Sequence, residues 1–162
     1  MKRRERGREI ALQALYQLDL RQEEFGPAIV GFLRESTQDA EVYFFSRRLT
    51  EGAWAWRAQA DRLVREAAEH WTPDRMAAID RNILRLATYE LAECPDIPRR
   101  VALDQAIELA KRFSSAESSA FVNGVLDHVL RIIEGEEPAA PVQDPPAAFP
   151  ATETGRPAEN EE

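Results

Sequence analysis

The sequence predicts a compact all-α domain of six or seven helices. Ala, Leu, Glu, Arg and Gln dominate residues 1–134 and glycine is sparse, a composition that favours helix. Apolar residues recur at the three- and four-residue spacing of amphipathic helices. No segment combines the two-residue alternation of a strand with the turn residues of a hairpin. At 162 residues, the chain has the natural length of one folded unit.

Three helices are expected in the first half of the chain, over residues 3–21, 27–33 and 39–70. The core stripe of the first helix consists of Ala11, Leu15 and Leu18. Pro27 fits the first turn of the second helix, where a missing amide proton costs no hydrogen bond. The third helix is a long amphipathic pattern, which Gly52 is expected to kink.

Three more helices are expected over residues 73–93, 100–113 and 117–134. Thr72 is a capping residue, Pro73 fits the first helical position, and Asp74 lies near the positive end of the helix dipole. Pro95 and Pro98 separate the next pair of helices, because proline lacks an amide proton and clashes with the preceding turn.

Charge is distributed unevenly along the chain, whose net charge is −8. Residues 136–162 hold six of the ten prolines, and seven acidic residues against one basic residue. Such a segment buries too little apolar surface to fold, so we predict a disordered tail after a folded domain of residues 1–135. The tail is expected to be a solvating extension, or alternatively a polyanion that screens the basic N-terminus. The first ten residues carry five basic and two acidic side chains, which indicates an anionic partner.

Motifs for catalysis, metal binding and membrane insertion are absent from the sequence. It contains no Gly-rich phosphate loop, no nucleophile elbow, no paired cysteines and no apolar run of membrane-spanning length. Cys94 is the single cysteine, which excludes an internal disulfide and fits a reducing cytoplasm. His70 and His128 fit structural or solvated roles. We therefore expect a cytoplasmic binding protein, not an enzyme, with no metal and no cofactor.

Two surfaces are candidates for nucleic-acid binding. At the N-terminus, Arg4, Arg6 and Arg8 surround the start of the first predicted helix. Arginine matches phosphate geometry, and its charge opposes the helix dipole at this end, which favours a functional explanation over a stabilising one. The alternative is a frayed, solvated terminus.

The second surface combines basic, aromatic and amide side chains, namely Lys111, Arg112, Phe121 and Asn123. Phe121 falls at the edge of the last helix's core stripe, where a ring can be partly exposed. Such a combination can hold single-stranded RNA by backbone charge, stacking and base-edge contacts. The alternative is an ordinary core phenylalanine.

Three blocks of the sequence resemble the NusB family of bacterial transcription antitermination factors. They are RGREIALQALYQLDL, DRNILRLATYEL and VALDQAIELAKRFSSAESSAFVNGVLDHVL, and the likeness covers residues 3–134. The resemblance implies an all-helical fold in two subdomains, without enzymatic activity. It also implies binding to boxA RNA, a complex with the ribosomal protein NusE, and association with other Nus factors on RNA polymerase during transcription of ribosomal RNA operons.

The resemblance also implies site residues. The RNA surface would consist of Arg4, Arg6, Arg8, Lys111, Arg112, Glu117, Phe121 and Asn123. The NusE surface would include Tyr16, Asp80 and Leu84. Glu117 would moderate the RNA affinity rather than supply it. Glu5, Gly7 and Glu9 interrupt the arginine cluster and depart from the family pattern.

These assignments require the basic N-terminus to lie beside residues 111–123 in space. Reversing the charge of Arg6 and Arg8 is then expected to weaken RNA binding with the melting temperature nearly unchanged. Two other readings stay open. NusB-like domains also occur fused to RNA cytosine methyltransferases, although the 28 residues after 134 are too few for a cofactor domain. A protein-only helical scaffold or homodimer would bury the arginine surface without direct RNA contact.

Overall fold

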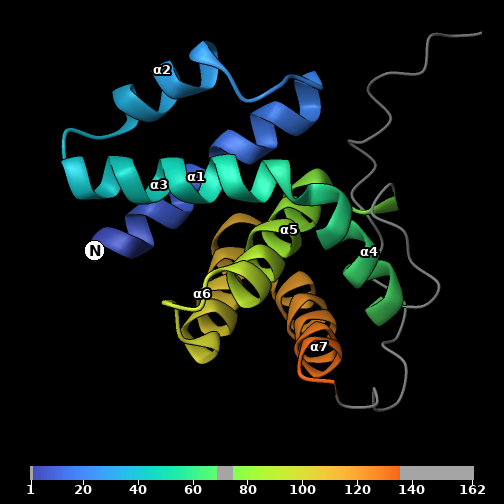
Figure 1. Cartoon of the computed structure of the whole chain (residues 1–162). Helices are drawn as coiled ribbons and strands as arrows, with labels where there is room; N and C mark the ends of the chain where they lie inside the picture. Colours follow the sequence, from blue (N-terminus) through green and yellow to red (C-terminus); the bar gives the residue numbers. More distant parts are fainter. Residues whose placement is uncertain (1, 69–74, 136–162) are drawn as a thin grey trace, which may run out of the picture.

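The computed structural model describes residues 2–68 and 75–135, and it contains helices but no strand in these ranges (Figure 1). The helices are α1 (Arg3–Arg21), α2 (Pro27–Ser36), α3 (Ala40–Ala55), α4 (Arg57–Ala68), α5 (Ala78–Glu93), α6 (Arg99–Phe113) and α7 (Ala116–Ile133). The all-α fold class predicted from the sequence is confirmed.

The helices form two groups that α5 joins. The first group is α1, α2 and α3, in which α1 crosses α3 (Figure 1). The second group is α4, α6 and α7, in which α7 packs against α4 and α6. Helix α5 contacts α1 and α3 on one side and α4, α6 and α7 on the other. The core is therefore continuous from one group to the other, with Leu15, Ile83 and Leu126 fully buried in it.

The predicted bounds of the terminal helices agree closely with the structure. Helix α1 has the predicted bounds, and α6 and α7 each begin one residue earlier than expected. The side chain of Ser115 caps α7 by accepting a hydrogen bond from the Ser118 amide. Helix α2 continues beyond its predicted end to Ser36. The predicted tail 136–162 lies outside the described residues.

The predicted helix over 39–70 is divided into α3 and α4 at Trp56, so the kink expected at Gly52 is wrong. Gly52 instead allows a close approach between helices, because a Cβ atom there would overlap the phenol of Tyr89 on α5. The start signal at Thr72, Pro73 and Asp74, together with His70, lies outside the described residues. Helix α5 itself begins at Ala78.

A second close approach positions the start of α1. A Cβ atom on Gly7 would lie 2.7 Å from Cδ1 of Phe45, so α1 rests directly on α3 at this point. The guanidinium of Arg4 lies 4.7 Å from the centre of the same ring. The basic end of α1 is thereby fixed to the body of the protein. None of the helices found in the described ranges is long and apolar enough to cross a membrane.

Candidate nucleic-acid and partner surfaces

A buried carboxylate joins the start of α1 to the end of α6. Nη1 of Arg6 lies 3.2 Å from Oε2 of Glu9, and Nη1 of Arg112 donates a hydrogen bond to Oε1 of the same side chain. Glu9 is buried, whereas both arginines keep much of their side chains exposed. The structure thus brings the two predicted basic regions together at Arg112. In the sequence Glu9 interrupts the N-terminal arginine cluster, but in the structure its carboxylate holds Arg6 and Arg112 in place.

Four basic side chains at the start of α1 and the end of α6 remain accessible, and we call them the α1/α6 surface: Arg4, Arg6, Lys111 and Arg112. Nζ of Lys111 lies 3.6 Å from Oε1 of Glu108, an exposed pair that contributes little to stability. Phe113 follows directly in sequence, is partly exposed, and has the Arg112 guanidinium 5.4 Å from its ring centre. Sequence reasoning missed Phe113, although its position after two basic residues at a helix end was a usable signal.

Arg8 does not belong to this surface, contrary to the sequence prediction. Its side chain is 2% exposed, and its Nε and Nη2 atoms lie 2.9 and 2.8 Å from Oε1 of Glu90. Glu90 is equally buried on α5. The pair is a structural link between α1 and α5, so reversing the charge of Arg8 leaves two like charges in the core. The expectation of an unchanged melting temperature therefore loses its basis at Arg8.

The residues of α7 that were predicted to contact RNA differ in exposure. Glu117 and Asn123 are exposed near the start of the helix. Phe121 is only 8% exposed and belongs to the core cluster, so the partial exposure expected for its ring is wrong. Phe121 is buried together with Val122 and Val125, because the buried face of α7 is wider than the apolar stripe expected from the sequence. In this arrangement Phe121 supplies packing and presents little ring surface to a base.

Two of the three residues assigned to NusE also lie inside the protein. Leu84 is 1% exposed in the core. Asp80 is buried, and its Oδ2 accepts a hydrogen bond of 3.1 Å from Oγ of Ser118 on α7. Burial raises the pKa of the Asp80 carboxyl, against the opposing hydrogen bonds from Ser114 and Ser118. Tyr16 is 37% exposed, and Leu20 lies one helical turn further on and is 58% exposed.

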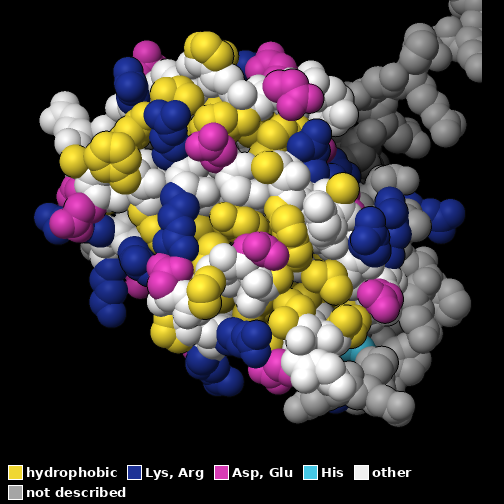
Figure 2. All heavy atoms as spheres, viewed as in Figure 1, with side chains coloured by type: hydrophobic (Ala, Val, Ile, Leu, Met, Phe, Trp, Pro, Cys, Tyr) yellow, Lys and Arg dark blue, Asp and Glu magenta, His cyan; other side chains and the backbone are white. Residues whose placement is uncertain are grey.

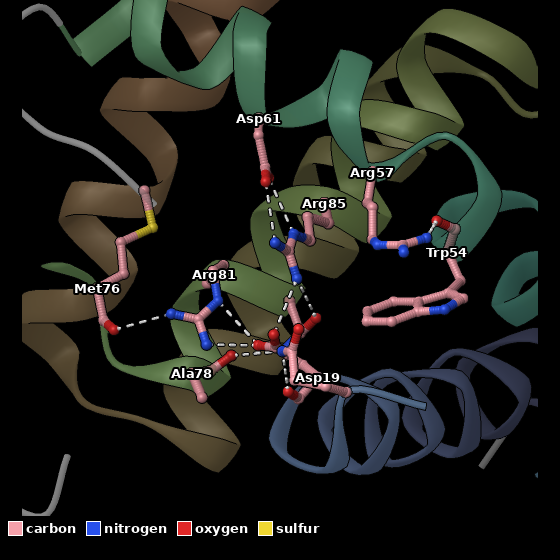
Figure 3. A network of polar contacts seen from close by, with 10 residues as sticks. Asp19, Trp54, Arg57, Asp61, Met76, Ala78, Arg81 and Arg85 are labelled. Atoms are coloured by element: carbon pink, nitrogen blue, oxygen red, sulfur yellow. Dashed lines mark hydrogen bonds and ion pairs between the residues drawn. The ribbon is translucent and has the colours of Figure 1, made fainter. Parts of the chain in front are cut away.

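A network of polar contacts lies next to this exposed face, where α1, α4 and α5 meet (Figure 3). Oδ2 of Asp19 accepts hydrogen bonds of 2.8 Å from Nε of Arg81 and 2.9 Å from Nδ2 of Asn82. Arg85 lies between two carboxylates, with Nη1 3.3 Å from Oδ1 of Asp19 and Nε 2.9 Å from Oδ1 of Asp61. Sequence reasoning missed this network, because its contacts join helices far apart in the chain: Asp19 on α1 lies 62 and 63 residues from Arg81 and Asn82 on α5.

The arrangement is that of a helical binding protein. The buried charged groups around Glu90 and Asp19 are engaged in contacts between helices. Within the described residues, no group of three or more His, Cys, Asp or Glu side chains could hold a metal ion. What the surface offers is a cluster of exposed cations at one end of α1 and exposed apolar side chains at the other. Such features suit an anionic ligand and a protein partner.

Comparison with known proteins identifies the class more closely. The NusB family model matches residues 5–131, and the chain belongs to the NusB family. The transcription antitermination protein NusB of Symbiobacterium thermophilum is 44% identical over 140 residues, which cover 82% of this chain and 92% of that protein. NusB of Myxococcus xanthus is 44% identical over 130 residues, covering 78% of this chain and 93% of that protein. The family predicted from the sequence is confirmed.

Solved structures of the same family share the fold. A crystal form of T. maritima NusB is 36% identical, has a TM-score of 0.71, and covers 81% of this chain and 92% of its own. A NusB chain from a structure of antitermination factors NusB and NusE in complex with double-stranded RNA is 26% identical, with a TM-score of 0.73. That match covers 82% of this chain and 98% of the other.

Proposed function

We propose that this chain is a transcription antitermination factor that binds boxA RNA together with NusE and supports processive transcription of ribosomal RNA operons by RNA polymerase in the cytoplasm. Family membership and the relatives' function support the proposal, as does the complex of a related NusB with NusE and RNA. The observation that carries it is the convergence of Arg6 and Arg112 on buried Glu9. This contact brings one cation from each of two distant segments to the same carboxylate, which supports a shared RNA surface.

The mechanism is equilibrium binding without a catalysed reaction. The α1/α6 surface offers four cations to a single strand, and each contacted phosphate releases counterions. If about four phosphates are neutralised, the logarithm of the binding constant falls with the logarithm of salt with a slope of about −3. Binding by so few contacts is weak. A NusE molecule that lengthens the RNA path raises the affinity by linking two surfaces on one strand.

Reversing two exposed charges of the α1/α6 surface is expected to weaken RNA binding without unfolding the protein. Arg4 and Lys111 suit this test, because neither holds the buried Glu9 carboxylate. The Arg4→Glu/Lys111→Glu variant should bind boxA-type RNA more weakly, with the salt slope reduced to about −1.5. Fluorescence anisotropy titrations at several salt concentrations measure both quantities.

The matched control carries the same change of net charge away from this surface. Arg62 and Arg65 are both exposed on α4. The Arg62→Glu/Arg65→Glu variant should keep the slope of the unchanged protein. Equal losses in the two variants would show that overall charge, and not the α1/α6 surface, governs RNA affinity.

For NusE we propose the exposed face of α1 at Tyr16 and Leu20 in place of buried Asp80 and Leu84. Truncating both exposed side chains to alanine should lower the affinity for NusE about tenfold or more, because central apolar contacts dominate such interfaces. Isothermal titration with purified NusE gives the affinity, and Val101→Ala removes a comparably exposed apolar side chain from α6 as a control. Unchanged affinity in the Tyr16→Ala/Leu20→Ala variant would remove this face from the interface.

A further inference from the structure

A second cluster of arginine and aromatic side chains lies on α2 and α3. Nε of Arg34 and Nη1 of Arg47 lie 3.4 and 3.1 Å from the phenol oxygen of Tyr43. The ring of Phe44 meets the ring of Tyr43 edge-on, with centroids 5.1 Å apart, and Phe44 is 66% exposed. We call these four residues the α2/α3 cluster. Figure 2 shows Lys or Arg side chains next to hydrophobic ones over α3.

The stability of the fold does not explain this cluster. Two guanidinium groups converge on one neutral hydroxyl, although like charges repel. None of the described carboxylates lies within ion-pair distance of Arg34, and Arg47 has only Glu51 at 3.9 Å. The hydrogen bonds from Arg34 and Arg47 lower the pKa of the Tyr43 phenol, as expected where positive charge is in excess. A large exposed ring beside two guanidinium groups, only one of which is paired with a carboxylate, is typical of a binding surface.

The cluster lies next to the α1/α6 surface. Nη2 of Arg6 is 3.4 Å from the carbonyl oxygen of Ser36, which ends α2 two residues after Arg34. Two acidic residues, Asp39 and Glu41, lie at the start of α3 beside this contact. Arg3 pairs with both of them and offsets one of their two negative charges, with Nε 2.9 Å from Oδ2 of Asp39 and Nη1 2.9 Å from Oε2 of Glu41. Because Arg6 contacts the end of α2, a strand on the α1/α6 surface can continue onto α2 and α3.

We propose that the α2/α3 cluster binds single-stranded RNA that extends beyond the segment held by the α1/α6 surface. A phosphate would lie between Arg34 and Arg47, and a base would stack on Phe44. The inference rests on the proposed function, because it lengthens the RNA path of the same protein. It adds contacts that need no particular base sequence, since every base has a face that can stack.

The chemistry favours RNA over a protein partner. Protein interfaces have an apolar centre surrounded by a polar rim. Here a single strongly exposed ring stands beside two guanidinium groups, whereas the other large exposed apolar side chains lie on α1 and α6. One aromatic platform with adjacent cations is the arrangement that holds the backbone and bases of a single strand.

The test compares a boxA-type RNA with the same RNA carrying an unstructured single-stranded extension at its 5′ or 3′ end. Anisotropy titrations with the full chain measure the affinity for each RNA. An extension at one end should strengthen binding about tenfold, the gain expected from one stacked base and added phosphate contacts. Phe44→Ala, and separately Arg34→Gln/Arg47→Gln, should abolish that gain and bind the unextended RNA as before. Val101→Ala and Arg62→Gln are matched controls that should retain it.

The outcomes separate this inference from the proposed function. If the unextended RNA binds but neither extension adds affinity, or if the variants keep the gain, the α2/α3 cluster is not an RNA site and the proposed function stands. If the unchanged protein binds none of the RNAs, with NusE present or absent, both fail. A Phe44→Ala variant that loses affinity for NusE but keeps the gain from the extension would assign the cluster to a protein interface. Circular dichroism melting verifies that each exposed substitution leaves the fold intact.

Discussion

Replacing Arg8 with methionine is expected to lower the free energy of unfolding by about 3–5 kcal/mol. Arg8 and Glu90 are each 2% exposed, and burial already raises the pKa of the Glu90 carboxyl while its partner is present. The loss therefore reflects a buried charge left without compensation, which costs far more than an exposed ion pair contributes. Urea denaturation followed by circular dichroism measures the change.

A double-mutant cycle distinguishes this explanation from lost packing. In the Arg8→Met/Glu90→Leu variant neither charge remains, so its free energy of unfolding should exceed that of the Arg8→Met variant. Arg4→Met is the matched control, because Arg4 contacts the same Phe45 ring from an exposed position. The explanation fails if the Arg8→Met and Arg4→Met proteins are equally stable, or if removing the second charge brings no recovery.

This result bears on how RNA-binding data are interpreted. Arg4, Arg6 and Arg8 are equivalent in the sequence, and all three look like phosphate ligands. A weakened RNA complex in an Arg8 variant would reflect partial unfolding, because α1 also carries Arg4 and Arg6 of the α1/α6 surface. Affinity measured at a temperature well below the melting transition, with Arg4→Glu/Lys111→Glu alongside, separates contact from stability.

The helices were largely predictable from the sequence because their signals are local. Apolar periodicity and the prolines after α5 determined α1, α6 and α7 to within about one residue. The division at Trp56 was not predictable in this way. Gly52 attracted the expected kink because it is a weak helix former, yet its missing side chain serves a contact with Tyr89 on another helix. Periodicity shows which face of a helix is buried, not which helix buries it.

The candidate site was predictable in outline and not in detail. The sequence indicated the two basic segments, but not that Glu9 would hold Arg6 and Arg112 together across 103 residues. Glu90 did carry a usable signal, because this acid falls on the apolar face of α5. A charge at a core position requires a buried partner, and Arg8 is that partner. Phe121 and Leu84 were expected at binding surfaces, but neighbouring helices bury both side chains. Their exposure was therefore inferred wrongly.

Replacing Asp19 with alanine is expected to destabilise the protein by about 3–5 kcal/mol, the other large effect. Asp19 is buried at the end of α1, and its carboxylate holds Arg81, Asn82 and Arg85 of α5 (Figure 3). Removing it takes the shared carboxylate away from Arg81 and Arg85, while Asp61 stays paired with Arg85. Chemical denaturation gives the change in stability.

Asp61→Ala is the matched control, since Asp61 is more exposed and pairs with Arg85 alone among the described residues. Water can reach the space that the Asp61 side chain leaves. The Asp61→Ala variant should therefore lose clearly less free energy of unfolding than the Asp19→Ala variant. Asp19→Asn should lie between them, because the amide keeps an acceptor oxygen but loses the charge that compensates two arginines. Equal stability of the Asp19→Ala and Asp61→Ala proteins would show that the network does not depend on the α1 carboxylate. α1 would then be held to α5 mainly by apolar packing and by Arg8 and Glu90 near its other end.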